Sequence, residues 1–259
     1  MSNENTSVTN GSVDTNKLAK IIAEELKKDD YINDILDDYS WPLRRWSLNG
    51  RDTLRFKRKK YKSFVCILNE KNKSKAEIDD KKIEWTKGVL MWGGIRGNSK
   101  KTIIKYSTQS AKRLRNLSKG ISSWSKVLAF RNPGGDFIYD YRVAFALNFI
   151  LISHNEKISR YFFIPPSART NSNSKSKYAY CNLISRLLGK INDGVDLKDF
   201  ALTPQKSYSL YTKLIRQIIK ILNDDTNKRF HLKGCGKQKV EMALFMKFKD
   251  YEKRLVSGD

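Results

Sequence analysis

The chain has 259 residues, of which 39% are hydrophobic and 30% are charged, which is typical of a globular protein with a sizeable core. Lys and Arg number 51 against 27 Asp and Glu, and the resulting formal charge of +24 attracts polyanions. No stretch approaches the roughly 20 apolar residues of a membrane span, so the composition argues against a membrane-spanning chain and favours nucleic acid as the partner.

Helical periodicity dominates the chain. Residues 1–14 are rich in Ser, Asn and Thr and are expected to form a disordered tail, not a signal peptide. In chain order, we then expect a helix within 15–36, a basic stretch with aromatic residues over 44–62, a strand or buried helical segment over 63–68, and a charged helix or linker over 70–82. Further helices are expected over 83–92, 123–130, 141–152, 178–188, 207–222 and 240–248, with a turn at 132–135. The predicted fold class is mostly α, with a few short strands near 63–68 and 137–139.

Two stretches contain no acidic residue at all. The first, 97–119, carries seven bases, and we expect them to bind the DNA backbone: Lys100, Lys101, Lys105, Lys112, Arg113, Arg115 and Lys119. The second covers 157–192. Basic runs also occur as solvated surfaces, so charge alone does not define a function.

The stretch 117–147, LSKGISSWSKVLAFRNPGGDFIYDYRVAFAL, holds the candidate residues for a reaction. A turn leads into a short helix that bears Lys126, a Pro-Gly-Gly turn follows, and Asp140 stands directly before a buried helix. Asp is a preferred helix N-cap, so Asp140 also has a structural interpretation. Lys126, taken alone, is one lysine among many.

This stretch resembles the active-site segment of the helix–hairpin–helix DNA glycosylase superfamily and is most similar to its 8-oxoguanine-glycosylase-like bacterial branch. The sequence VEMALF at 240–245 is similar to the closing helix of that branch, so the similar segments cover about 120–250. The resemblance implies a two-lobed helical fold in one domain over 15–259, with a basic region to about 95 and a catalytic core from about 96. A hairpin and the helix after it are expected to grip one DNA backbone.

The resemblance also implies roles for individual residues. Asp140 matches the essential aspartate, and Lys126 matches the catalytic lysine. Ser122, Ser123 and Ser125 stand where the family has glycines, and their hydroxyls are expected to bind phosphate. The candidates for the base pocket are aromatic: Trp92, Trp124, Tyr139 and Tyr141.

The implied activity is flipping a modified base out of double-stranded DNA and hydrolysing its N-glycosidic bond, which leaves an abasic site. A carboxylate facing the sugar stabilises the positive charge that develops there. Attack by a lysine would instead give a Schiff base and strand cleavage, an associated lyase activity. The implied substrate is 8-oxoguanine or a modified phage base such as glucosylated hydroxymethylcytosine, in repair or antiviral defence. We expect a monomer without metal or organic cofactor.

Three other functions are open at this stage. A non-catalytic nucleic-acid-binding protein would use Asp140 only as a cap. A metal-dependent nuclease would need clustered carboxylates, for which Glu77, Asp79, Asp80 and Glu84 are available, although they are typical of a solvated helix face. A membrane-surface protein would also use the positive charge.

The cysteines bear on localisation and on metal binding. They number three, Cys66, Cys181 and Cys235, and are widely spaced, which indicates a reducing, cytoplasmic location and no metal cluster. The lone pair of His231 and Cys235 does not define a metal site. Glu241, within an apolar helix, is expected to make a structural hydrogen bond.

Overall fold

The computed structural model describes residues 14–28, 31–42, 47–154, 162, 164–165, 182–183, 185, 201–224 and 236–257. Residues 1–13 of the expected tail lie outside these residues, as do His231, Cys235, nearly all of the second acid-free run and most of the helix expected over 178–188. Asp14 is described, and it caps the first helix by accepting hydrogen bonds from the amides of Asn16 and Lys17 at 2.9 and 3.1 Å.

The described chain is mostly helical, as the sequence predicts. The helices are α1 (Thr15–Lys27), α2 (Tyr31–Asp38), α3 (Gly50–Leu68), α4 (Lys75–Trp92), α5 (Lys100–Thr108), α6 (Ala111–Arg115), α7 (Ile121–Arg131), α8 (Tyr141–Ser153), α11 (Pro204–Asn223) and α12 (Gly236–Ser257). Two short strands, β1 (Trp41–Pro42) and β2 (Ser47–Leu48), form an antiparallel pair. None of the described helices has the length and apolar character needed to cross a membrane.

The strand expectations are corrected in two places. Residues 63–68 are the last turns of helix α3, because the helical spacing of Phe64 and Ile67 buries both side chains. Residues 137–139 are extended but pair with no strand among the described residues. The single helix expected within 15–36 is two helices, α1 and α2.

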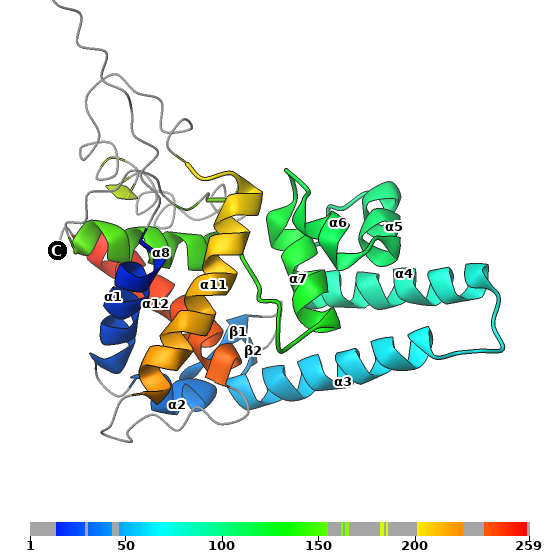
Figure 1. Ribbon diagram of the computed structural model, residues 1–259, viewed down its shortest axis with the longest axis horizontal. Coiled ribbons are helices and arrows are strands. Elements are labelled where there is room, and N and C mark those ends of the chain that lie inside the picture. The colour runs from blue at the N-terminus through cyan, green and yellow to red at the C-terminus, as the bar shows by residue number, and fades with distance from the viewer. Residues whose placement is uncertain are drawn as a thin grey trace, which may run out of the picture.

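The helices form two groups (Figure 1). In one, α1 packs along α11, and α12 packs against α2, α8 and α11. In the other, α4 packs against α3, α5 and α7, and α3 and α4 lie side by side as a long hairpin. The first helices of the chain thus share a group with the last, so the basic region over 15–95 does not pack as a unit of its own.

Side chains define where most of the helices begin. Ser74 and Glu77 form a reciprocal capping box at α4, and Ser99, Ser110 and Thr203 cap α5, α6 and α11. Helix α7 differs, since it follows Gly120, which has φ of 75° and offers no side-chain cap. A side chain at Gly120 would also collide with the Tyr106 hydroxyl, so glycine is required at this turn.

The two most buried helices, α7 and α8, carry the candidate site. Every residue of α7 from Ser123 to Phe130 is buried, as is nearly all of α8. Arg131, at the end of α7, donates to the backbone carbonyls of Tyr106, Ser107 and Gln109 and so fixes α7 against the end of α5. Burial lowers the pKa of the Arg131 guanidinium to about 10, which leaves it charged at neutral pH.

Candidate active site

Lys126 and Asp140 meet at the junction of the two helix groups. The Lys126 ammonium lies 3.9 Å from Oδ2 of Asp140 and donates to the Ser122 carbonyl at 2.9 Å. Asp140 caps α8 through the amides of Arg142 and Val143, and the Arg142 guanidinium lies 3.5 Å from Oδ2. The lysine side chain is 3% exposed and the aspartate side chain 12%. A buried carboxylate thus faces two cations while its other oxygen holds the start of a helix.

Gly93 makes the space in which Lys126 lies. A Cβ atom at Gly93 would approach Cδ of Lys126 to 2.5 Å and Cε to 2.9 Å. The end of α4 therefore lies directly against the lysine stem. The close approach of Lys126 explains the glycine at position 93. The backbone conformation does not, since its φ of −70° suits any residue.

Ser125, the residue before Lys126, forms hydrogen bonds with Tyr139, the residue before Asp140. Its hydroxyl accepts a hydrogen bond from the Tyr139 amide at 3.1 Å and donates to the Tyr139 carbonyl at 3.2 Å. Ser125 precedes Lys126 and Tyr139 precedes Asp140. Helix α7 and the segment before Asp140 are therefore joined one residue before each functional group. The side chain is fully buried.

Glu241 binds the backbone of Ile138, the residue before Tyr139. It accepts the Ile138 amide at 2.6 Å and pairs with the Lys57 ammonium at 2.8 Å, with both side chains almost fully buried. Burial, and then the nearby Glu241 carboxylate, raise the pKa of Tyr39 well above its usual value. These residues line a cavity of about 10 Å³, which has room for one water molecule but not for a base. The structural hydrogen bond expected of Glu241 is confirmed, and Lys57 is a partner that the sequence did not reveal.

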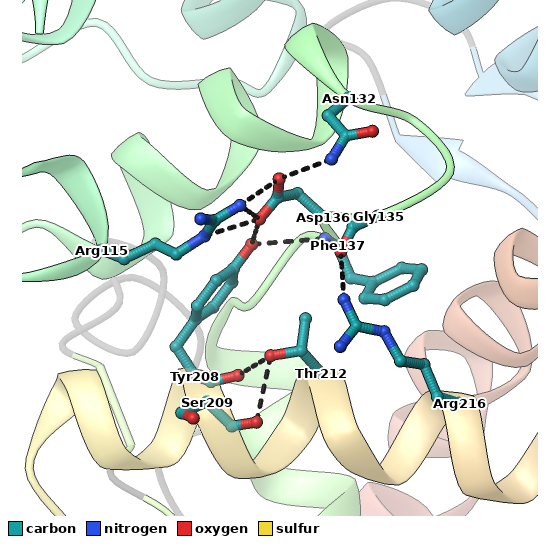
Figure 2. Close-up of polar contacts among 9 residues, drawn as sticks. All are labelled: Arg115, Asn132, Gly135, Asp136, Phe137, Tyr208, Ser209, Thr212 and Arg216. Carbon is teal, nitrogen blue, oxygen red and sulfur yellow. Dashed lines mark hydrogen bonds and ion pairs between the residues drawn. The ribbon is translucent and has the colours of Figure 1, made fainter. Parts of the chain in front are cut away.

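Asp136 anchors the other end of the extended segment (Figure 2). The Arg115 guanidinium pairs with both carboxylate oxygens at 2.7 to 3.0 Å, and the Tyr208 hydroxyl and Asn132 amide donate to the same carboxylate. The Tyr208 oxygen in turn accepts the Phe137 amide at 3.3 Å. Side chains of three helices, Tyr208 of α11, Glu241 of α12 and Ser125 of α7, thus bind the backbone amides of residues 137–139 where a neighbouring strand would otherwise do so.

The predicted phosphate-binding bases lie on α5, on α6 and in the turn before α7. Six of them are exposed, and no acidic side chain in the described ranges forms an ion pair with them: Lys100, Lys101, Lys105, Lys112, Arg113 and Lys119. Arg115 differs, because its guanidinium binds Asp136. Helix α6 packs against α7, the helix that carries Lys126, and the turn ending at Gly120 connects the two.

The three predicted serines have different positions. Ser122 is partly exposed in the first turn of α7, and Ser123 receives a hydrogen bond from Asn98 at 3.3 Å. Ser125 is buried against Tyr139, so the phosphate-contact prediction does not fit it.

The four aromatic candidates are all buried in the core. Their ring contacts are with other core side chains: Trp92 with Phe56 and Phe130, Trp124 with Tyr208, Tyr139 with Tyr211, and Tyr141 with Phe145 and Phe248. The prediction that these four side chains line an open base pocket therefore does not fit the structure. The disagreement is greatest for Trp124 and Tyr139, whose side chains have no solvent-exposed surface.

The described residues contain no cluster of His, Cys, Asp or Glu that could hold a metal ion. Glu77 belongs to the capping box of α4, and Asp79 pairs with Lys82 at 3.2 Å.

Comparison of the chain with protein-family models, with curated proteins and with solved structures finds no match.

Proposed function

We propose that the chain is a DNA glycosylase that flips a modified base out of double-stranded DNA and breaks its N-glycosidic bond. The observation that carries the proposal is the approach of Lys126 and Asp140 to 3.9 Å in a buried setting. They lie fourteen positions apart in the sequence, and the family resemblance singles out both. Two opposite charges kept this close and largely out of water are frequent in catalytic sites.

Asp140 would stabilise the positive charge that develops on the deoxyribose as the base leaves. The carboxylate suits this role because the amides of Arg142 and Val143 hold it in place, so little reorganisation is needed. Lys126, once it gives up a proton, would attack the sugar carbon that loses the base. The product would be a Schiff base between Nζ and the sugar, followed by strand cleavage.

DNA would lie along the exposed bases of α5, α6 and the turn before α7. These cations border the helix that carries Lys126, so backbone contacts there would bring a strand toward the pair. Those contacts would offset the few kcal/mol, roughly, that unstacking a base costs. Because Lys126 is only 3% exposed, the chemistry requires the residues that cover it, including Gly93, to move when DNA binds.

The second candidate is a non-catalytic nucleic-acid-binding protein, and one observation favours it. Asp140 already has a complete structural role as the N-cap of α8, and that role needs no chemistry. In this alternative, Lys126 only neutralises the buried carboxylate.

Duplex oligonucleotides carrying 8-oxoguanine, uracil, hydroxymethylcytosine or glucosylated hydroxymethylcytosine, incubated with EDTA, separate the candidates. A glycosylase produces hot-alkali cleavage at one modified position, and Asp140→Asn abolishes it. Cleavage without alkali, lost in Lys126→Gln, adds the lyase step. Tight binding with no abasic site on any duplex, or an Asp140→Asn protein as active as wild type, contradicts the proposal.

A further inference from the structure

The side chain of Ser125, on α7, binds the backbone of the extended segment that ends at Asp140. Residues 137–139 pair with no strand among the described residues, so their backbone groups depend on side chains of neighbouring helices. Among the described residues, the Ser125 hydroxyl both accepts a hydrogen bond from the Tyr139 amide and donates one to the Tyr139 carbonyl. A buried serine within a helix often bonds the carbonyl one turn earlier, whereas this one bonds across to another part of the chain.

We propose that Ser125 is a positioning residue that sets the separation of Lys126 and Asp140. The inference rests on the proposed function. Each end of the double hydrogen bond lies one residue before a functional group, so a slide of the segment along α7 changes the distance from Nζ to Oδ2 directly. Asp140 itself is held by the start of α8, and the Lys126 stem by Gly93. Glu241 and Tyr208 hold the segment against α12 and α11, and Ser125 sets its register against α7.

Ser125→Ala removes the acceptor and the donor together and leaves both backbone groups of Tyr139 without this partner in a fully buried place. A displacement of catalytic groups by about 1 Å costs roughly 100-fold in rate. We therefore expect Ser125→Ala to lower the single-turnover rate of base release by about that factor. DNA affinity should stay within about twofold, because the change acts in the transition state and not in ground-state binding.

The experiment compares wild type, Ser125→Ala, Ser125→Cys and a matched control, Ser107→Ala. Ser107 is also a buried helical serine, and its hydroxyl donates to the Ile104 carbonyl at 2.8 Å, far from the pair in sequence. Cysteine keeps the side-chain shape but is a weak donor and acceptor, so it carries the test if the alanine variant does not fold. Each protein is measured by single-turnover base release, by DNA affinity and by hydrogen exchange of the Tyr139 amide.

The proposal expects faster exchange of the Tyr139 amide and slower base release in both Ser125 variants, with affinity and the Ser107→Ala protein close to wild type. Exchange that accelerates while base release stays at the wild-type rate overturns the positioning role. An unchanged exchange rate of the Tyr139 amide in the Ser125 variants contradicts the hydrogen bond between this amide and the Ser125 hydroxyl. No base release by wild type, on any modified duplex, refutes the proposed function and with it the role of Ser125.

Discussion

Under the proposed function, Gly93→Ala should slow base release roughly 100-fold by displacing Lys126 while leaving the backbone intact. The new Cβ atom would lie 2.5 Å from Cδ of Lys126, whereas unbonded carbon atoms prefer about 3.5–4.0 Å. The lysine stem must therefore move by about 1 Å, and such a displacement costs roughly 100-fold in rate. That factor corresponds to about 2.7 kcal/mol of activation free energy. Overfilling a buried site also costs about 1–3 kcal/mol of stability.

The assay is single-turnover base release at 25 °C, normalised to the folded fraction measured by circular dichroism. Gly134→Ala is the matched control, because a Cβ there meets nothing within 4 Å and the backbone conformation suits alanine. The control should keep the wild-type rate. If Gly93→Ala folds and releases base as fast as Gly134→Ala does, the position of Lys126 does not govern the reaction, and the reasoning is refuted.

Three further predictions concern stability and its pH dependence. Lys57→Met should lower the free energy of unfolding in urea by about 3–5 kcal/mol, because Glu241 is left charged and buried. Adding Glu241→Gln should restore part of this loss, and equal stability of single and double variants would contradict the ion pair. Burial raises the pKa of Glu25, but the hydrogen bond and charge of Lys28, together with Lys247 and Tyr251, lower it by more, so the net pKa lies below its usual value. The stability that Glu25 contributes is therefore present above its unfolded pKa, near 4.5, and is lost as pH falls through the folded value. Glu25→Gln should therefore flatten the fall of stability between pH 5 and about 3, and an unchanged slope would exclude this contribution. Burial, and then nearby carboxylates, raise the pKa of Tyr211, so the folded state keeps a proton that the unfolded state releases. Stability should fall by up to about 1.4 kcal/mol per pH unit above 10, and Tyr211→Phe should remove that part, as urea unfolding at pH 9 and 11 can measure.

The sequence predicts the helices well because their signals are local. The apolar spacing and polar caps of α8 and α11 define both helices to within a few residues. Residues 63–68 were ambiguous because a short apolar run fits a strand or a buried helix equally. Only packing against α4, through contacts such as Phe64 with Trp85, makes them helical.

The sequence singles out Asp140 and Lys126 through the family resemblance, and Asp140 also through its place before a buried helix. Their approach to 3.9 Å, and the other contacts around them, depend on residues that are distant in sequence. Lys57 is one base among many in its run, and nothing local indicates that it pairs with Glu241, 184 residues later. The helix expected over 83–92 ends just before Gly93, yet the contact of Gly93 with Lys126 depends on how α4 packs against α7. The sequence predicts that Ser125 binds phosphate, since burial of a serine in a basic segment has no sequence signal.

The most direct test of the central claim is detection of the released base. Duplex DNA containing 8-oxoguanine or glucosylated hydroxymethylcytosine is incubated with the protein and EDTA, and small molecules are analysed by mass spectrometry. The account predicts an intact free modified base from one of these substrates, with release by Asp140→Asn slower by at least about 100-fold. DNA binding without a free base from any substrate, or equal release by Asp140→Asn, would contradict it.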